Sequence, residues 1–157
     1  MVSLRFFNQE DFPDLNYPLT ELQLEYTSSA EFALKRIAER NTDLEFPVTI
    51  FKNKKPVGFF TLDFGEDKLD ITDNQNSTLL RSLSINPELQ GQGIGKVAML
   101  KIDDFIKENF KDCKEIVLAV NQNNISAYEL YLKVGYQYDG KNRMGRSGMQ
   151  YLMYKKL

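Results

Sequence analysis

A glycine cluster between a β-rich run and a long amphipathic stretch restricts the possible folds of this sequence more than any other feature. Residues 78–85 predict a strand that ends at Asn86 and Pro87. The glycines follow within residues 90–96, Gln-Gly-Gln-Gly-Ile-Gly-Lys, and apolar residues then recur at helical spacing over residues 94–110. A strand, a glycine turn and a helix in this order leave free N–H groups at the positive end of a helix dipole. The sequence therefore predicts a local site for an anion, such as a phosphate, in this turn.

The glycines alone do not identify the ligand, because a flexible turn between a strand and a helix explains them equally well. Two nucleotide-binding patterns fail here. A Walker phosphate loop needs Ser or Thr after its Gly-Lys pair, whereas Val97 follows Lys96. A dinucleotide-binding loop needs G-x-G-x-x-G, and Lys96 stands where its third glycine belongs.

The rest of the chain predicts further strands and helices around this turn. β-rich runs predict strands at 4–7, 46–51, 57–64, 115–120, 136–138 and 150–155. Helical spacing predicts helices at 20–26, 29–41 and 124–134, and residues 65–77 predict a loop. No repeat or linker interrupts the order, so we expect one α+β domain over residues 1–157, with helices on both faces of a mixed sheet centred near Ile85.

Composition excludes several classes of function. A net charge of −2, with acids and bases interspersed, provides no cationic face for nucleic acid. The chain has no histidine and a single cysteine, Cys113, so we expect no metal site and no disulfide. No apolar run has the length of a membrane span and the N-terminus does not resemble a signal peptide, so we expect a cytoplasmic protein without a membrane partner.

Two motifs in the second half of the chain resemble those of the GCN5-related N-acetyltransferases, the GNAT superfamily. The pattern [Q/R]-x-x-G-x-[G/A] is matched by Gln90, Gly93 and Gly95. Residues 124–131, Asn-Ile-Ser-Ala-Tyr-Glu-Leu-Tyr, followed by Gly135 and Tyr136, resemble the family's N-x-x-A-x-x-L-Y segment. The resemblance is densest from Thr78 to Tyr138. It implies a mixed, mostly antiparallel sheet of six to seven strands, flanked by about four helices.

The same resemblance implies an N-acetyltransferase with acetyl-CoA (coenzyme A) as its cofactor. The amides around Gln92 to Val97 would then hold the pyrophosphate, and the backbone of Leu83 to Ile85 would pair with the pantetheine arm. The side chain of Asn124 would contact the same arm, act as a plain helix N-cap, or do both. The cofactor-binding residues implied in this way are Leu83, Ser84, Ile85, Gln90, Gly91, Gln92, Gly93, Ile94, Gly95, Lys96, Val97, Asn124 and Tyr131.

By resemblance Tyr131 is the general acid that protonates the departing thiolate, and the alternative is a core tyrosine on an apolar helix face. A backbone N–H near Leu83 to Ile85 would stabilise the carbonyl oxygen, because the strand must splay there to admit the cofactor. The general base is unassigned, since Leu79 occupies the position at which many family members carry glutamate. The proton of the attacking amine would leave through a carboxylate or through a water chain to solvent. The candidate carboxylates include Glu21, Glu25 and Asp63.

The acceptor amine is left open by the sequence. By family analogy it enters between the N-terminal helices and the last hairpin, beside Glu21, Glu25 and the loop at 143–148. Surplus acids in the first part of the chain favour a cationic amine, although scattered surface acids explain them better; these are Glu10, Asp11, Asp14, Glu21, Glu25 and Glu31. Polyamines, aminoglycosides, amino acids and protein N-termini all remain candidates, for a monomer or a homodimer.

Two alternatives to an acetyltransferase stay open at this stage. One is a non-catalytic acyl-CoA sensor or interaction module that kept the cofactor site after losing its base, which Leu79 favours and Tyr131 disfavours. The other is a generic globular domain in which the glycine turn is coincidental.

Overall fold

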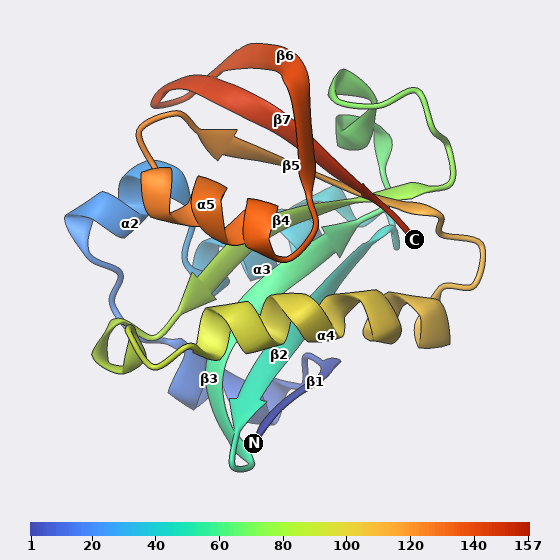
Figure 1. Ribbon diagram of the computed structural model, residues 1–157. Coiled ribbons are helices and arrows are strands. Elements are labelled where there is room, and N and C mark those ends of the chain that lie inside the picture. The colour runs from blue at the N-terminus through green and yellow to red at the C-terminus, as the bar shows by residue number, and fades with distance from the viewer.

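The computed structural model describes residues 1–157 and contains one seven-stranded sheet (Figure 1). Its strands are β1 (Val2–Phe6), β2 (Glu45–Lys52), β3 (Lys55–Asp63), β4 (Ser77–Ile85), β5 (Glu115–Asn121), β6 (Gln137–Gly145) and β7 (Gly148–Lys156). They lie in the order β1-β2-β3-β4-β5-β7-β6, and every neighbouring pair is antiparallel except β4 with β5. The predicted mixed, mostly antiparallel sheet is confirmed. The predicted centre of the sheet near Ile85 is also confirmed, because β4, which ends at Ile85, is the middle strand of the seven.

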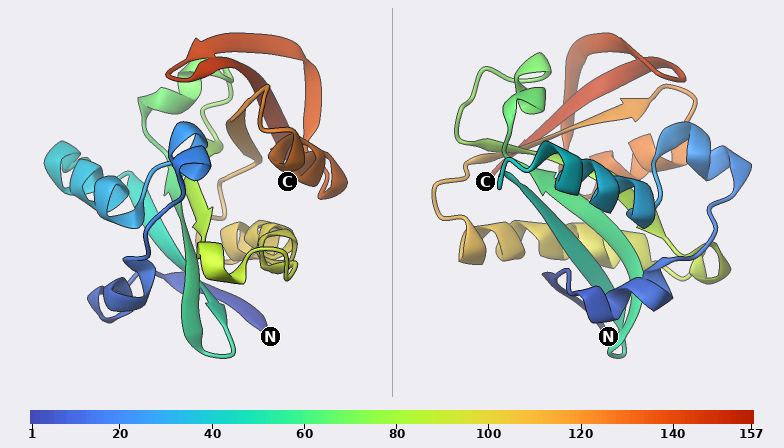
Figure 2. Two further views of the ribbon diagram at one scale, coloured as in Figure 1. Left: turned by 90° about the vertical axis from the view of Figure 1, so that its left-hand side faces the viewer. Right: turned by 180° about the vertical axis from the view of Figure 1, so that it is seen from behind.

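Helices cover both faces of the sheet, as predicted (Figure 2). They are α1 (Phe12–Leu15), α2 (Glu21–Tyr26), α3 (Ala30–Arg40), α4 (Ile94–Asn109) and α5 (Ile125–Lys133). On one face Leu15 of α1 and Ala33 of α3 pack against Phe59 of β3 in a small buried cluster. On the other face α4 and α5 cover a larger core, to which α4 contributes Ile94, Ala98, Met99, Ile102 and Ile106.

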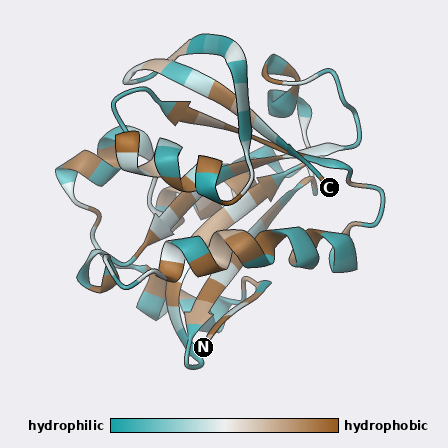
Figure 3. Ribbon diagram, viewed as in Figure 1, coloured by the Kyte–Doolittle hydropathy of each residue, from teal (hydrophilic) through white to brown (hydrophobic).

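The amphipathic pattern of residues 94–110 produces the best predicted helix. Ile94, Ala98, Ile102 and Ile106 recur every four residues and are all buried, so they form one stripe that faces the sheet. Figure 3 shows this hydrophobic stripe along α4. The stripe fixes α4 against the sheet, and this places the glycine turn at the N-terminal end of α4 next to β4. None of the helices is both long enough and apolar enough to cross a bilayer.

β4 and β5 separate soon after they meet. Their ladder joins only Ser77–Leu79 to Glu115–Val117. Farther along β4 a β-bulge sets Phe60 of β3 opposite two residues, and one of these, Ser82, has a positive φ of 58°. Beyond Leu79, β4 and β5 therefore do not pair with each other. The splay that the sequence predicted for this strand is present.

Three segments differ from the sequence-based expectation. Residues 137–145 form a longer strand than the predicted 136–138, and residues 143–148, expected as a loop, are mostly the strand ends of the β6–β7 hairpin. β6 is a largely exposed edge strand, so it lacks the apolar alternation that reveals a half-buried strand. The segment from Gln9 to Pro18, for which no helix or strand was predicted, contains a 3₁₀ turn at Gln9–Asp11 and α1, and the turn begins with a capping box between Asn8 and Asp11. A 3₁₀ helix at Glu66–Asp70 lies in the predicted loop at 65–77.

Candidate active site

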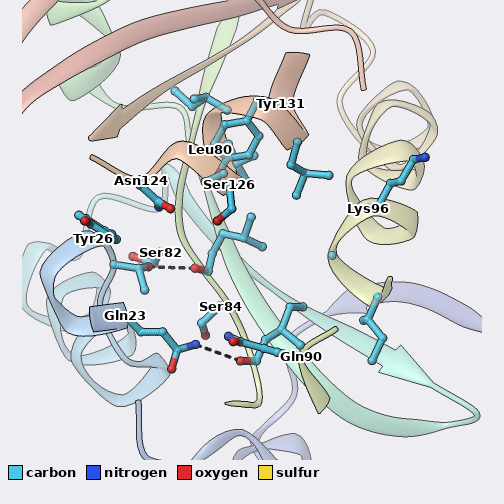
Figure 4. A pocket seen from close by; sticks show the side chains of 18 of the residues that line it. Gln23, Tyr26, Leu80, Ser82, Ser84, Gln90, Lys96, Asn124, Ser126 and Tyr131 are labelled. Atoms are coloured by element: carbon cyan, nitrogen blue, oxygen red, sulfur yellow. Dashed lines mark hydrogen bonds between the residues drawn. The ribbon is translucent and has the colours of Figure 1, made fainter. Parts of the chain in front are cut away.

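The splay between β4 and β5 opens into a cleft of about 530 Å³, which we call the β4–β5 cleft (Figure 4). Its wall comes from α2, β4, the glycine turn, β5 and α5. Half of its 24 lining residues are hydrophobic, so the cleft suits a long ligand that is apolar in part and polar in part.

The glycine turn contributes a row of backbone amides that have no partner. No amide from Gly91 to Lys96 donates a hydrogen bond within the chain, whereas the Val97 amide donates to the carbonyl of Gly93 at 3.2 Å. Gly91 and Gly93 have φ of 83° and 77°, a conformation that glycine adopts without strain. A Cβ at either position would meet nothing within 4 Å, so the turn is open on this side. Free amides at a helix N-terminus are groups that can bind a phosphate.

Side chains from the N-terminal segment hold the end of β4 beside the cleft. The Thr27 hydroxyl donates to the Leu83 carbonyl at 3.0 Å, and the Tyr17 hydroxyl contacts the Ser84 carbonyl at 3.2 Å and its Oγ at 2.8 Å. Nε2 of Gln23 donates to the Ile85 carbonyl at 3.3 Å. These side chains bind three carbonyls of β4 beyond its ladder with β5 and tie this part of the strand to the N-terminal segment.

These partners of β4 were missed by the sequence analysis. Gln23 also forms a capping box with Thr20 at the start of α2, and the Thr-x-x-Gln spacing was the one local signal available. Tyr17 and Thr27 carry no such signal, because they lie 67 and 56 residues from the backbone groups that they bind.

Tyr131 on α5 lines the cleft, and its hydroxyl makes no hydrogen bond within the chain. Its ring packs against the main core and lies 5.8 Å from the ring of Tyr136. Burial raises the pKa of Tyr131 to about 12, so the hydroxyl is protonated throughout the physiological pH range. Tyr131 therefore packs against the core and also lines the cleft. The sequence had offered these two positions as alternatives.

Asn124 precedes α5 at the N-cap position, but its side chain makes no capping hydrogen bond. It lines the cleft, and Figure 4 shows it on the same side of the cleft as Tyr26 of α2 and Ser82 of β4. The interpretation of Asn124 as a plain helix N-cap is wrong, because its side-chain amide points to the cleft and not to the backbone of α5.

The structure brings together all but two of the predicted cofactor-binding residues. Gln92 is outside the wall, and its Oε1 accepts a hydrogen bond from Lys52 Nζ at 2.9 Å. Val97 is also outside the wall, because its amide is already part of the first turn of α4. Sequence spacing located the turn correctly but could not show which backbone groups the helix itself would use.

No carboxylate lines the cleft. Leu79, at the position where a glutamate was sought, is 5% exposed and pairs with Val117 of β5, so the strand ladder occupies that position. Asp63 is buried and accepts from Arg81 at 3.1 Å, while Glu21 and Glu25 of α2 lie outside the wall. None of the three candidate bases is therefore placed in the cleft, and no group of acids is arranged to hold a metal ion.

A buried ion pair supports the bulge of β4 from behind. Arg36 of α3 donates to Glu45 of β2 at 2.9 Å, and their side chains are 14% and 2% exposed. The same guanidinium contacts Ser82 Oγ at 3.4 Å, and Ser28 Oγ lies 3.0 Å from that oxygen. Burial, and then the charge of nearby Arg81, lower the pKa of Arg36. The ion pair thus couples α3 and β2 to the strained residue of the bulge.

Comparison with known proteins places the chain beside acetyltransferases. The family model described as the acetyltransferase (GNAT) family matches residues 5–136. An uncharacterized N-acetyltransferase of Bacillus subtilis strain 168, YbbJ, is 36% identical over 158 residues, which cover 98% of this chain and 96% of the relative. The spermine/spermidine N(1)-acetyltransferase of the same strain is 29% identical over 128 residues and 81% of each chain.

Two solved structures have a similar fold. Spermidine N-acetyltransferase from Vibrio cholerae, in complex with CoA and spermine, aligns with a TM-score of 0.73 at 20% identity over 99% of this chain and 95% of its own. Aminoglycoside acetyltransferase AAC(6')-Ib, in complex with coenzyme A, aligns with a TM-score of 0.76 at 16% identity over the same shares.

Proposed function

Since the chain belongs to the acetyltransferase (GNAT) family, we propose that it transfers an acetyl group from acetyl-CoA to the primary amine of a small molecule or peptide. The family and the enzyme class, N-acetyltransferase, that the two motifs predicted are confirmed. The observation that carries the proposal is the protonated, unpartnered Tyr131 hydroxyl in a cleft that also presents free amides at the N-terminus of α4.

The residues of the cleft fit coenzyme A. The amides from Gly91 to Lys96 bind the pyrophosphate, and Lys96 adds a positive charge beside it. The stretch of β4 from Leu83 to Ile85, which does not pair with β5, and the side chain of Asn124 would contact the pantetheine arm. Two of the fold neighbours were solved with CoA bound, which supports this assignment. When bound, acetyl-CoA supplies the acyl thioester.

The chain then has three tasks: to orient the amine, to stabilise charge on the carbonyl oxygen and to return a proton to the sulfur. We assign the last task to Tyr131 because of its position in the wall of the cleft with an unpartnered hydroxyl. Its pKa of about 12 keeps that hydroxyl protonated at neutral pH, but position and not acidity supports the role. A backbone N–H next to the bulge, within Leu83 to Ile85, stabilises the oxygen as the amine attacks the thioester directly. The amine loses its proton to water in the open cleft, since no carboxylate lines it.

Replacing Gly93 by alanine is expected to weaken acetyl-CoA binding about five- to thirtyfold, because a left-handed conformation costs a non-glycine residue about 1–2 kcal/mol. Nothing packs against this position, so the free turn relaxes and binding must restore it. Calorimetry with acetyl-CoA measures the change. Gly140→Ala is the matched control, because Gly140 also has a positive φ and open surroundings but lies on β6 away from the cleft. Equal losses in the two variants would contradict the assigned site.

The pKa of the acceptor amine, and not the pKa of a group in the protein, should set the pH dependence of kcat/KM. Without a carboxylate base in the cleft, kcat/KM rises about tenfold per pH unit until the pKa of the amine used, because only the neutral amine attacks. Tyr131 acts in its protonated form, and that form is lost only as pH passes its pKa of about 12, so it adds no descending limb below that pH. Profiles for two amines of different pKa make the test. A plateau at the same pH for both amines would reveal a protein base.

The sensor hypothesis rests on the missing base, since Leu79 is locked in the strand ladder. Free thiol release on incubation with acetyl-CoA and a panel of primary amines separates the two functions. An amine-dependent release supports the acetyltransferase. Tight acetyl-CoA binding with no release from any amine supports the sensor, and absence of binding would refute both.

A further inference from the structure

The charges that face the β4–β5 cleft are all positive. Arg81 of β4 and Lys96 of the glycine turn are the only ionisable side chains of Asp, Glu, Lys or Arg type in its wall. Lys96 is the last residue of the glycine turn, and Arg81 lies on β4 next to Ser82 of the bulge. An acceptor therefore meets no carboxylate on the wall.

The carboxylates closest to this region along the sheet are already paired. Arg81 bridges Asp63 at 3.1 Å and Asp67 at 2.7 Å, and Asp67 also accepts from Arg40 at 2.8 Å. Two hydrogen bonds from arginines, Arg40 first and Arg81 second, lower the pKa of Asp67, so it remains ionised and engaged. These acids neutralise the arginines around them and leave no negative charge for a second ammonium group.

A further cation stands at the entrance between α2 and the β6–β7 hairpin. Arg146 at the tip of the hairpin donates to the Leu24 carbonyl at 2.8 Å, at the C-terminal end of α2, and its guanidinium has no carboxylate partner. This contact joins the two elements between which the acceptor was expected to enter. The entrance is therefore closed on one side by a positively charged group.

The side chains of α2 that line the cleft at this entrance are apolar or neutral, whereas Glu21 and Glu25 of the same helix lie outside the wall. Leu22 lines the cleft and is nonetheless 62% exposed, and Tyr26 lies one helical turn farther along the same face of α2. Ile125, which follows Asn124, is 63% exposed but lies outside the wall. An apolar ligand bound in the cleft would cover Leu22, which would remove its apolar surface from water. Figure 4 shows Tyr26 and Asn124 at this end of the cleft.

We propose that the acceptor is a primary amine with an apolar body and no second positive charge. This inference rests on the proposed acetyltransferase function and narrows its substrate class. A polyamine or an aminoglycoside brings several ammonium groups, and in this cleft the additional ones would lose water without meeting a carboxylate. The acids of the N-terminal segment do not change this, because none of them lines the cleft.

A matched pair of amines tests the proposal. Hexylamine and 1,6-diaminohexane have the same chain length and differ in the second ammonium group. We expect kcat/KM for hexylamine to exceed that for the diamine by about tenfold or more, the ratio that corresponds to about 1.4 kcal/mol. Calorimetry of both amines with the CoA-saturated protein should show the same order of affinity. Equal values, or a preference for the diamine or for spermidine, would overturn the inference while leaving the acetyltransferase function intact.

A pair of variants locates the effect. Leu22→Glu places a carboxylate in the wall of the cleft, and we expect it to raise kcat/KM for the diamine about tenfold relative to hexylamine. Leu100→Glu adds the same charge at an exposed position of α4 outside the wall, so it should leave the ratio unchanged. Identical ratios in the two variants would refute the assigned acceptor surface. Absence of thiol release with every amine would instead refute the proposed function, and the calorimetric order would still decide the inference.

Discussion

Tyr131→Phe is expected to lower kcat by about 10²–10⁴-fold, the usual contribution of a positioned general acid. The variant removes only a hydroxyl that has no partner in the chain, and it keeps the ring that packs against the core and Tyr136. Acetyl-CoA affinity should therefore stay within about twofold of the parent value, which calorimetry measures beside steady-state thiol release.

Tyr128→Phe is the matched control for this prediction. Tyr128 lies one turn earlier on α5, outside the wall of the cleft, and its ring packs between Tyr138 and Tyr151. Its replacement should leave both kcat and acetyl-CoA affinity unchanged. Full activity of Tyr131→Phe would remove Tyr131 from the mechanism, and an equal loss in both variants would point to a disturbed helix instead of a missing acid.

The second large effect concerns stability. Glu45→Leu should lower the free energy of unfolding by up to about 3–5 kcal/mol, because it leaves the partly buried Arg36 without its carboxylate. For a domain of this size the change corresponds to a fall in Tm of about 6–20 °C. Thermal and denaturant unfolding, monitored by circular dichroism, measure both quantities.

Two further variants test the cause of that loss. The double variant Arg36→Met with Glu45→Leu replaces both charges by apolar groups and should recover most of the stability. Asp70→Asn removes one partner of the exposed Arg143–Asp70 pair, which spans 3.5 Å, and should cost less than about 1 kcal/mol. If the double variant were as unstable as Glu45→Leu, packing at residue 45 and not the unpaired charge would explain the effect.

Prediction from sequence succeeded where the information is local. The apolar positions of α4 recur every four residues, and the glycines that precede them supply the positive φ that the turn requires, so the helix and the turn follow from one stretch of sequence. The N-x-x-A-x-x-L-Y segment likewise marked α5 and placed Tyr131 on it. It failed at β6, where an exposed edge strand leaves no apolar alternation to read.

By itself the sequence determined the family, the order of most elements, the glycine turn and the position of Tyr131, because each depends on residues within one turn or one strand of each other. Only the tertiary structure decided the wall that an acceptor would meet. The bonds from Tyr17 and Thr27 to β4 join residues 67 and 56 positions apart, and the pairing of Asp63 and Asp67 with Arg81 depends on how β3, β4 and the 3₁₀ helix between them meet. Whether a charged side chain is free or already neutralised is a property of neighbours in space. The sequence could therefore count the acids of this protein, and only the fold shows that none of them faces the cleft.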